Sequence, residues 1–347
     1  MKTVKKIAAL AALVGCVLAA HEVAKAQADE PEMVEKVKIT GVDGQVLGSY
    51  VASEVGSIDF VEEAPEFDDS DILIQLSPTV SFHMIKVEGG VPYTLTGTIS
   101  FSGSAWSGDA ATKQMETFWI GMTEVTQGEW KEVMGVTTLP TASNGSQTLV
   151  NDKAPIGCVS WNDIAGSADG TYLKKLNARL AELKASNPAL AQALGNREFR
   201  LPDEWEWSYA AAGGKDYATL NYYFAGTSGT TASDLETVAV NSVDPNKATS
   251  VATVGSKQPN NLGLVDMSGN VQEWCSGTGY PGHENEGGFL GYKSTWYGSN
   301  RPFRGGCWGD STLDYFRVAR YCYSFIENNG SNTADFSSRS VGFRLAL

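Results

Sequence analysis

GLVDMSGNVQEW at residues 263–274 holds a tight glycine turn, Ser268-Gly269-Asn270, between two acidic residues, Asp266 and Glu273. Calcium takes about six to eight oxygen ligands, and such a loop can offer two carboxylates together with backbone carbonyls. The spacing by itself favours a simpler interpretation, in which Gly269 is a turn residue and both acids accept backbone hydrogen bonds. Two further runs follow, RGGCW at residues 304–308 and VGFR at residues 341–344, and the three runs together decide the fold.

The composition indicates one large, loop-rich domain. Of the 347 residues, 42% are hydrophobic, which is enough for a sizeable core. Gly is frequent, with 37 residues, and long helical patterns are few, so a mixed α+β fold is favoured over a helical bundle. The formal net charge is −14, and residues 29–71 hold 13 acidic residues against two lysines. No basic stripe is present, which excludes nucleic acid as a partner.

Residues 1–28 have the pattern of an export signal, with lysines first, an apolar run at residues 7–20 and small residues before Asp29. The run is too short for a membrane span of about 20 residues, so no transmembrane segment is expected in the mature chain. Cleavage before Asp29 is favoured, because the apolar run continues past Cys16. The alternative is a lipid anchor at Cys16, since residues 13–16 resemble a lipobox. Both alternatives place the protein outside the cytoplasm, in the periplasm, at the cell surface or secreted.

An acidic β-hairpin module with a linker is expected at residues 29–76. Apolar residues alternate on both sides of Asp43-Gly44, which is a hairpin signature. The charged run at residues 62–69 is typical of a solvated linker. The main domain is then expected at residues 77–347.

Several runs predict the elements of the main domain. Residues 118–130 are expected to form a strand that leads into a helix, with Thr126 and Glu129 at the spacing of a capping box. Residues 154–161 are expected to form a strand before another helix, and residues 199–211 a central helix. Leucines at helical spacing predict one more helix with ordinary core packing: Leu173, Leu176, Leu180 and Leu183.

These blocks, in this order, resemble the formylglycine-generating enzyme (sulfatase-modifying factor) family. The resemblance includes FHMIKVEGG at residues 82–90 and covers residues 77–347. It implies an irregular, loop-rich α+β domain of the C-type-lectin-like kind, with little regular secondary structure. It also implies an oxidase that converts a cysteine of newly made sulfatases to formylglycine, using molecular oxygen and copper(I).

The resemblance makes the glycine loop a predicted calcium site. The ligands it implies are the side chains of Asp266 and Glu273 and the main-chain carbonyls of Gly269 and Val271. A second calcium site of the family begins at the position of Asn241. The loop that follows it departs from the family pattern in this chain.

The catalytic cysteines of the family are missing from their expected positions. In the enzymes, two cysteines about five residues apart follow a Gly-Gly-Ser motif, and soft thiolates suit copper(I). Here the first position is Asp310, the second falls near Tyr315, and Cys307 replaces the serine of the motif. Cys307 and Cys322 are the candidates for a replacement copper pair. A structural disulfide or buried thiols are favoured instead, and four cysteines after the leader allow three pairings: Cys158, Cys275, Cys307 and Cys322.

Other side chains point to no second chemistry. The fold also hosts iron-dependent sulfoxide synthases with three histidines, but only His83 and His283 follow the leader, which excludes such a site. Trp308 and Tyr315, with Trp296 and Tyr297, are candidates to line a peptide or sugar groove, against core packing for Trp308. Five arginines are expected to tie loops together through ion pairs with acidic residues: Arg200, Arg304, Arg317, Arg320 and Arg344.

The sequence therefore favours an exported, catalytically degenerate member of this family. It would act as a calcium-stabilised binding or structural module of the cell envelope, with a protein, peptide or glycan ligand. The alternative is an active formylglycine-generating oxidase that uses copper. The degenerate form is preferred because the site, and not the fold, decides the function.

Overall fold

The computed structural model describes residues 23–24, 36–40, 46–51, 71–95, 98–101, 104–107, 111–216, 223–244, 247–276, 301–318 and 335–347. The chain divides into two units, Met1–Asp69 and Ser70–Leu347. Among the described residues, no helix is long and apolar enough to cross a membrane.

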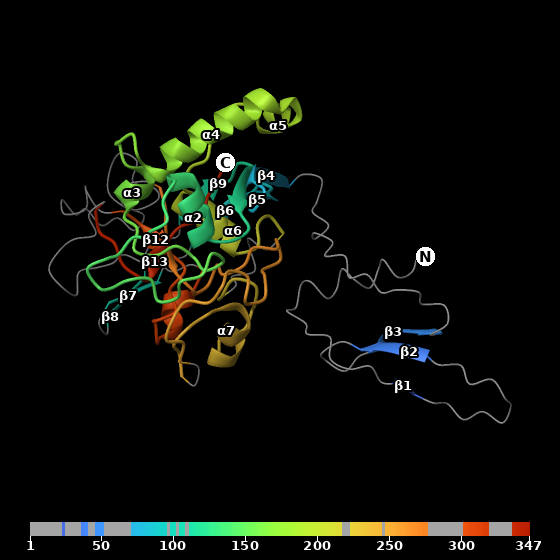
Figure 1. Cartoon of the computed structure of the whole chain (residues 1–347). Helices are drawn as coiled ribbons and strands as arrows, with labels where there is room; N and C mark the ends of the chain where they lie inside the picture. Colours follow the sequence, from blue (N-terminus) through green and yellow to red (C-terminus); the bar gives the residue numbers. More distant parts are fainter. Residues whose placement is uncertain are drawn as a thin grey trace. The chain divides into compact units, whose positions relative to one another are not determined.

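The first unit contains the hairpin that the alternation around Asp43-Gly44 predicts. Strand β2 (Lys36–Thr40) pairs antiparallel with β3 (Val46–Val51), and β1 (Val23–Ala24) pairs antiparallel with β2 (Figure 1). β1 lies within the predicted export signal. Cys16, with its alternative of a lipid anchor, lies outside the described residues.

The second unit begins with an antiparallel sheet in the order β10-β5-β4. β5 (Val80–Val87) is central, with β4 (Ile72–Ser77) on one side and β10 (Phe118–Gly121) on the other. Alternate residues of β4 are buried, as a strand with one face on the core requires. Because β4 pairs with β5, this unit begins at Ser70, before the expected domain start at residue 77.

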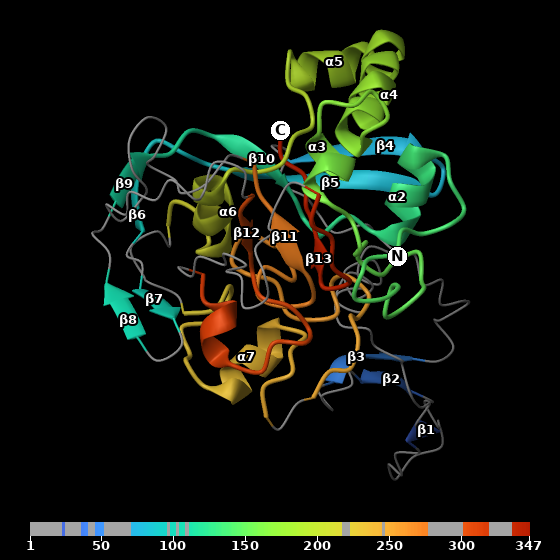
Figure 2. The ribbon, with the colours of Figure 1, turned by 90° about the vertical axis from the view of Figure 1, so that its left-hand side faces the viewer.

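The three runs that decide the fold form one small sheet near the centre of the second unit (Figure 2). β11 (Gln272–Trp274) pairs antiparallel with β12 (Phe303–Arg304) and parallel with β13 (Val341–Gly342). Glu273 lies opposite Arg304 on one side and Gly342 on the other. Segments far apart in the sequence therefore meet at Glu273.

Helix starts follow the capping signals. α2 (Gln127–Met134) begins after Thr126, whose main-chain N donates to Glu129 Oε2 at 2.6 Å while its hydroxyl accepts from Glu129 N at 3.2 Å, which confirms the capping box. Boxes of the same kind open three other helices: α3 (Trp161–Ala165), α6 (Glu204–Ala211) and α7 (Ala232–Val238).

The strand predicted at residues 154–161 is wrong. This segment makes one isolated bridge, between Pro155 and Thr126. The backbone N–H of Ile156 donates to Val125 and that of Cys158 to Ser338, so its hydrogen bonds go to two different loops rather than to one strand.

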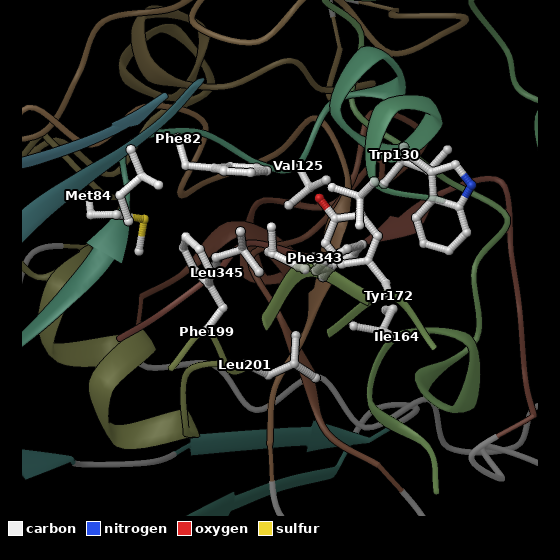
Figure 3. Packing of buried hydrophobic residues seen from close by; sticks show 14 of the residues in the cluster. Phe82, Met84, Val125, Trp130, Ile164, Tyr172, Phe199, Leu201, Phe343 and Leu345 are labelled. Atoms are coloured by element: carbon white, nitrogen blue, oxygen red, sulfur yellow. The ribbon is translucent and has the colours of Figure 1, made fainter. Parts of the chain in front are cut away.

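The leucine stripe forms α4 (Tyr172–Ser186), and α5 (Pro188–Leu194) follows it. Leu176 and Leu180 are buried in the main core, and Leu173 and Leu183 pack against it, as predicted. In Figure 3, Tyr172 at the start of α4 packs beside Trp130 and Phe343. Its ring stacks on Trp130 with the centroids 5.2 Å apart and meets Phe343 edge-on at 5.1 Å.

The other elements are short. β6 (Pro92–Leu95) pairs with β9 (Ala111–Gln114), β7 (Thr98–Phe101) pairs with β8 (Ser104–Ser107), and Leu313–Phe316 forms a 3-10 helix, η2. Long irregular segments connect the elements of the second unit. The prediction of an irregular, loop-rich α+β domain is confirmed.

Candidate functional site

Arg344 and Glu273 form a fully buried ion pair at the central sheet. Arg344 Nε donates to Glu273 Oε2 at 2.6 Å and Nη2 donates to Oε1 at 2.7 Å, while Trp207 Nε1 donates to Oε2 at 2.7 Å. The guanidinium also donates to the carbonyls of Gly121, Met122 and Val265 at 3.0–3.3 Å. This bidentate geometry suits arginine, and the contacts tie two segments, at Gly121 and Met122 and at Val265, to β11 and β13.

Other predicted arginines also form ion pairs. Arg304 Nε donates to Glu204 Oε1 at 2.9 Å, and both side chains are buried. Arg200 makes two contacts of 2.6 Å with Glu206. Arg317 lies 3.4 Å from Asp314, and Arg320 lies outside the described residues. All four described arginines form ion pairs. Arg304 and Arg344 join segments that are distant in the chain, whereas Arg317 pairs with a residue three positions away.

The predicted calcium loop is a buried turn in a strained backbone conformation. Asp266, Gly269 and Asn270 have φ angles of 58°, 103° and 60°. Asp266 Oδ2 accepts a hydrogen bond from Gly255 N at 2.6 Å, whereas its buried Oδ1 has no hydrogen-bond partner among the described residues. The main-chain N of Gly269 donates to Gly305, which fastens the loop to the RGGCW run.

Glu124 is a site residue that the sequence analysis missed. Its carboxylate accepts from Asn270 Nδ2 at 2.8 Å and from Val271 N at 3.0 Å. Glu124 follows β10 in the sequence, so these bonds hold the glycine loop to the segment after that strand. Burial, followed by repulsion from Asp266 and Glu273, raises the pKa of Glu124 well above its usual value. Burial also raises the pKa of Asp266 to about 6. Glu124 opens the run EVTQGEW at residues 124–130, whose spacing predicts only a helix start.

The glycine loop lies among buried charges whose oxygens mostly have protein partners: both oxygens of Glu273 accept from Arg344, and both oxygens of Glu124 accept from the loop. Three buried carboxyls, those of Glu124, Asp266 and Glu273, surround one guanidinium, that of Arg344. Lys257 also acts on Asp266, but it is paired with Glu236 at 2.7 Å. Among the described residues, no three His, Cys, Asp or Glu side chains meet as a metal-binding group. Backbone carbonyls would therefore have to complete a calcium shell here, as the family site implies for Gly269 and Val271.

Asn241, the start of the second predicted calcium site, uses its amide to hold its own turn. Its Oδ1 accepts from Val243 N at 2.9 Å and its Nδ2 donates to Ala239 O at 3.2 Å. Part of the loop that follows, residues 245–246, lies outside the described residues. The second site stays a prediction.

The first of the family's catalytic cysteine positions, Asp310, has a structural role in this chain. Asp310 Oδ2 accepts from Cys307 N at 2.8 Å, and Asp310 N donates to Cys307 O at 3.0 Å, which closes a tight turn. Tyr315 lies in η2 and is partly exposed. Burial raises the pKa of the Cys307 thiol, and Asp310 raises it further, so the thiol stays protonated at neutral pH.

No pair of thiolates for copper(I) is formed by the described cysteines. Cys158, Cys275 and Cys307 are free and buried, and burial raises the pKa of all three thiols. These residues do not fit a copper(I) site, which needs accessible thiolates. Cys322, the other candidate, lies outside the described residues.

Trp308 lies next to this turn, under an exposed arginine. Its main-chain N donates to Asn270 O at 2.8 Å, and the guanidinium of Arg339 lies 5.5 Å from its ring centroid. Its ring is partly buried, so its burial favours neither the alternative of a core residue nor that of a groove residue. Trp296, Tyr297 and His283 lie outside the described residues.

Comparison with known proteins agrees with this geometry. The family model for the sulfatase-modifying factor enzyme 1-like domain matches residues 77–347. The chaperone protein LppX of Paenibacillus barcinonensis is 28% identical over 222 residues, which are 57% of this chain and 72% of the relative. The formylglycine-generating enzyme of Streptomyces coelicolor is 35% identical over 155 residues, 42% of this chain and 46% of the enzyme.

The solved structure of Treponema denticola variable protein 1 has a similar fold. It superposes with a TM-score of 0.54 at 24% identity, over 81% of this chain and 99% of that protein. The family model covers most of the chain, and the sheet built from its C-terminal runs supports the match. The chain therefore belongs to the sulfatase-modifying factor enzyme 1-like domain family.

Proposed function

We propose that this protein is a non-catalytic member of the family and acts as a calcium-stabilised binding module of the cell envelope. The observation that carries the proposal is the turn at the catalytic position. Asp310 replaces the first cysteine and binds the backbone of Cys307 at 2.8 Å, so that side chain is used for structure. The site decides the function even where the fold is shared with enzymes.

A protein ligand is the partner that we favour. The relative from Paenibacillus is named a chaperone. The match covers 72% of that relative, compared with 46% of the formylglycine-generating enzyme from Streptomyces. The exposed Arg339 above Trp308 offers a cationic and aromatic contact of the kind found at protein interfaces. The location outside the cytoplasm rests on the leader at residues 1–28 and stays a prediction.

An activity assay separates this proposal from the oxidase alternative. The full chain is loaded anaerobically with copper(I) and then incubated with oxygen and a cysteine-containing sulfatase peptide. We expect no conversion of the peptide, because the described thiols are buried and protonated. The enzyme from Streptomyces is the positive control. Formation of formylglycine, seen as a mass change of the peptide, would overturn the proposal and support an active oxidase.

Calcium removal is expected to lower the melting temperature of the protein. A cation present at 100 times its dissociation constant stabilises the folded state by about 2.7 kcal/mol. For a domain of this size that corresponds to roughly 5 °C. Chelator should produce this shift in a calcium-loaded sample, measured by calorimetry.

Two variants test the position of the calcium site. Asp266→Ala should abolish the difference between calcium and chelator, because it removes the carboxylate oxygen that has no hydrogen-bond partner in the described part of the chain. Asp314→Ala is the matched control, since that acid lies in η2 and pairs with Arg317. A wild-type melting temperature that is insensitive to chelator rules the calcium site out.

A further inference from the structure

A cavity of about 140 Å³ lies at β5, and its wall shares Gly121, Met122 and Glu124 with the surroundings of the site above. Its walls come from β5, from the turn after β10, from α2 and from Leu345. Phe82, Met84, Val125 and Leu345 line it and are buried, so most of the wall is apolar. A dry cavity of about 150 Å³ can hold a molecule as large as benzene, so this one has room for a short alkyl chain.

Glu129 is the charged group that this wall offers to a ligand. Its Oε2 accepts from Thr126 N at 2.6 Å, and no ion pair to Glu129 is present among the described residues. No lysine or arginine is among the described residues that line the cavity. Burial raises the pKa of Glu129 to about 7, which is the behaviour of a carboxyl in apolar surroundings without a cation beside it.

The two other titratable wall residues do not compete with Glu129 for a cation. Glu124 uses its carboxylate on Asn270 and Val271, on the side of the glycine loop. Burial lowers the pKa of His83, against a smaller effect of Asp71, so its imidazole is uncharged at neutral pH. A cationic ligand in the cavity therefore faces no lysine or arginine side chain among the described wall residues, and Arg344 reaches the wall at the carbonyls of Gly121 and Met122.

Tyr172 places a second polar atom near Glu129. Its hydroxyl is fully buried and has no hydrogen-bond partner in the described part of the chain. Glu129 is the charged group that acts on it electrostatically. Figure 3 shows the hydroxyl pointing toward Val125, a residue of the cavity wall. Tyr172 is not part of the cavity wall, so its hydroxyl belongs to the surroundings of Glu129 rather than to the ligand contacts.

We propose that this cavity binds a protonated primary amine on a short alkyl chain, with Glu129 as its counter-ion. The apolar wall surrounds the methylene groups, and the ammonium reaches the carboxylate. The net charge of −14 favours the approach of cations. The ligand is either a free alkylamine or the lysine side chain of a protein. This inference does not depend on the loss of catalytic cysteines.

The first test is calorimetric titration of the full chain with n-butylammonium chloride at pH 8, where Glu129 is ionised. We expect saturable binding with a dissociation constant on the order of 1 mM, as for a small ligand in a small pocket. n-Butanol, which has the same chain without the charge, should bind at least about tenfold more weakly. Absence of saturable binding up to about 50 mM, or equal binding of butanol, overturns the proposal.

Two matched variants locate the binding. Glu129→Gln removes the charge, and glutamine can still close the capping box, so α2 keeps its start. This variant should weaken butylammonium binding by about tenfold or more. Glu132→Gln removes the same charge from the same helix, but that carboxylate pairs with Arg179 at 3.1 Å, and binding should not change. Wild-type affinity in Glu129→Gln contradicts the assignment.

A peptide titration distinguishes the two sources of the amine. A blocked peptide with one lysine is compared with the same peptide carrying acetyl-lysine. Tighter binding of the lysine peptide than of butylammonium supports a protein side chain as the ligand. Weaker or equal binding supports a free amine. Equal binding of both peptides overturns the role of the ammonium.

Discussion

Arg344→Met is expected to lower the free energy of unfolding by about 3–5 kcal/mol, because it leaves a buried carboxylate without its cation. Glu273 is fully buried and loses two charge-assisted hydrogen bonds of 2.6 and 2.7 Å. The carbonyls of Gly121 and Val265 lose their donors in the same place. Methionine replaces much of the side-chain volume, so the loss reports mainly on charge and hydrogen bonding. Urea unfolding followed by tryptophan fluorescence measures it.

A second ion pair provides the control for Arg344. Arg317→Met removes an arginine that is partly exposed and lies 3.4 Å from Asp314, so it should cost at most about 1 kcal/mol. Adding Glu273→Gln to Arg344→Met should recover part of the loss, because the unpaired charge is then gone. A cost below about 1 kcal/mol for Arg344→Met would show that this ion pair does not hold the central sheet together.

Gly269→Ala is expected to cost about 3 kcal/mol or more, or to prevent folding. Gly269 has a φ of 103°, and a Cβ atom added there would lie 2.6 Å from the carbonyl oxygen of Val240. The left-handed backbone alone costs an L-residue about 1–2 kcal/mol. The collision with a backbone atom adds to that, since Val240 O accepts a hydrogen bond from Asn270 and cannot move freely. Circular dichroism and urea unfolding measure the effect.

Gly263 lies in the same run and serves as a control that separates backbone strain from the steric collision. Its φ is 82°, but an added Cβ would meet no heavy atom within 4 Å. Gly263→Ala should therefore cost only the backbone strain of about 1–2 kcal/mol. Equal losses at the two glycines would contradict the packing argument for Gly269.

Local features of the fold were open to prediction from the sequence. The capping box at Thr126 and Glu129 uses atoms only three residues apart, so the sequence contains the whole interaction. The α4 leucines are similar, because helical spacing alone places Leu176 and Leu180 on one buried face. The strand predicted at residues 154–161 is wrong because a strand needs a neighbour, and local alternation does not show whether one exists.

The candidate site could be predicted only in part. Asp266 and Glu273 are visible from their spacing around Gly269, and Asp310 and Tyr315 are visible because the runs set the expected positions of the cysteines. Glu124 was missed because its partner Asn270 is 146 residues away in the chain. The cavity with Glu129 was missed for the same reason, since His83 and Leu345 come from segments distant from Glu129.

The sequence by itself determined the family, the helix starts and the absence of cysteines at positions 310 and 315, because each depends on the identity of residues in short runs. Only the tertiary structure decided which charges share the buried centre. Glu273, Arg304 and Gly342 become neighbours through β-pairing, and Arg344 then becomes the cation of Glu273. Burial sets the protonation of Glu124 and Cys307, and burial is a property of the packed chain rather than of any run within it.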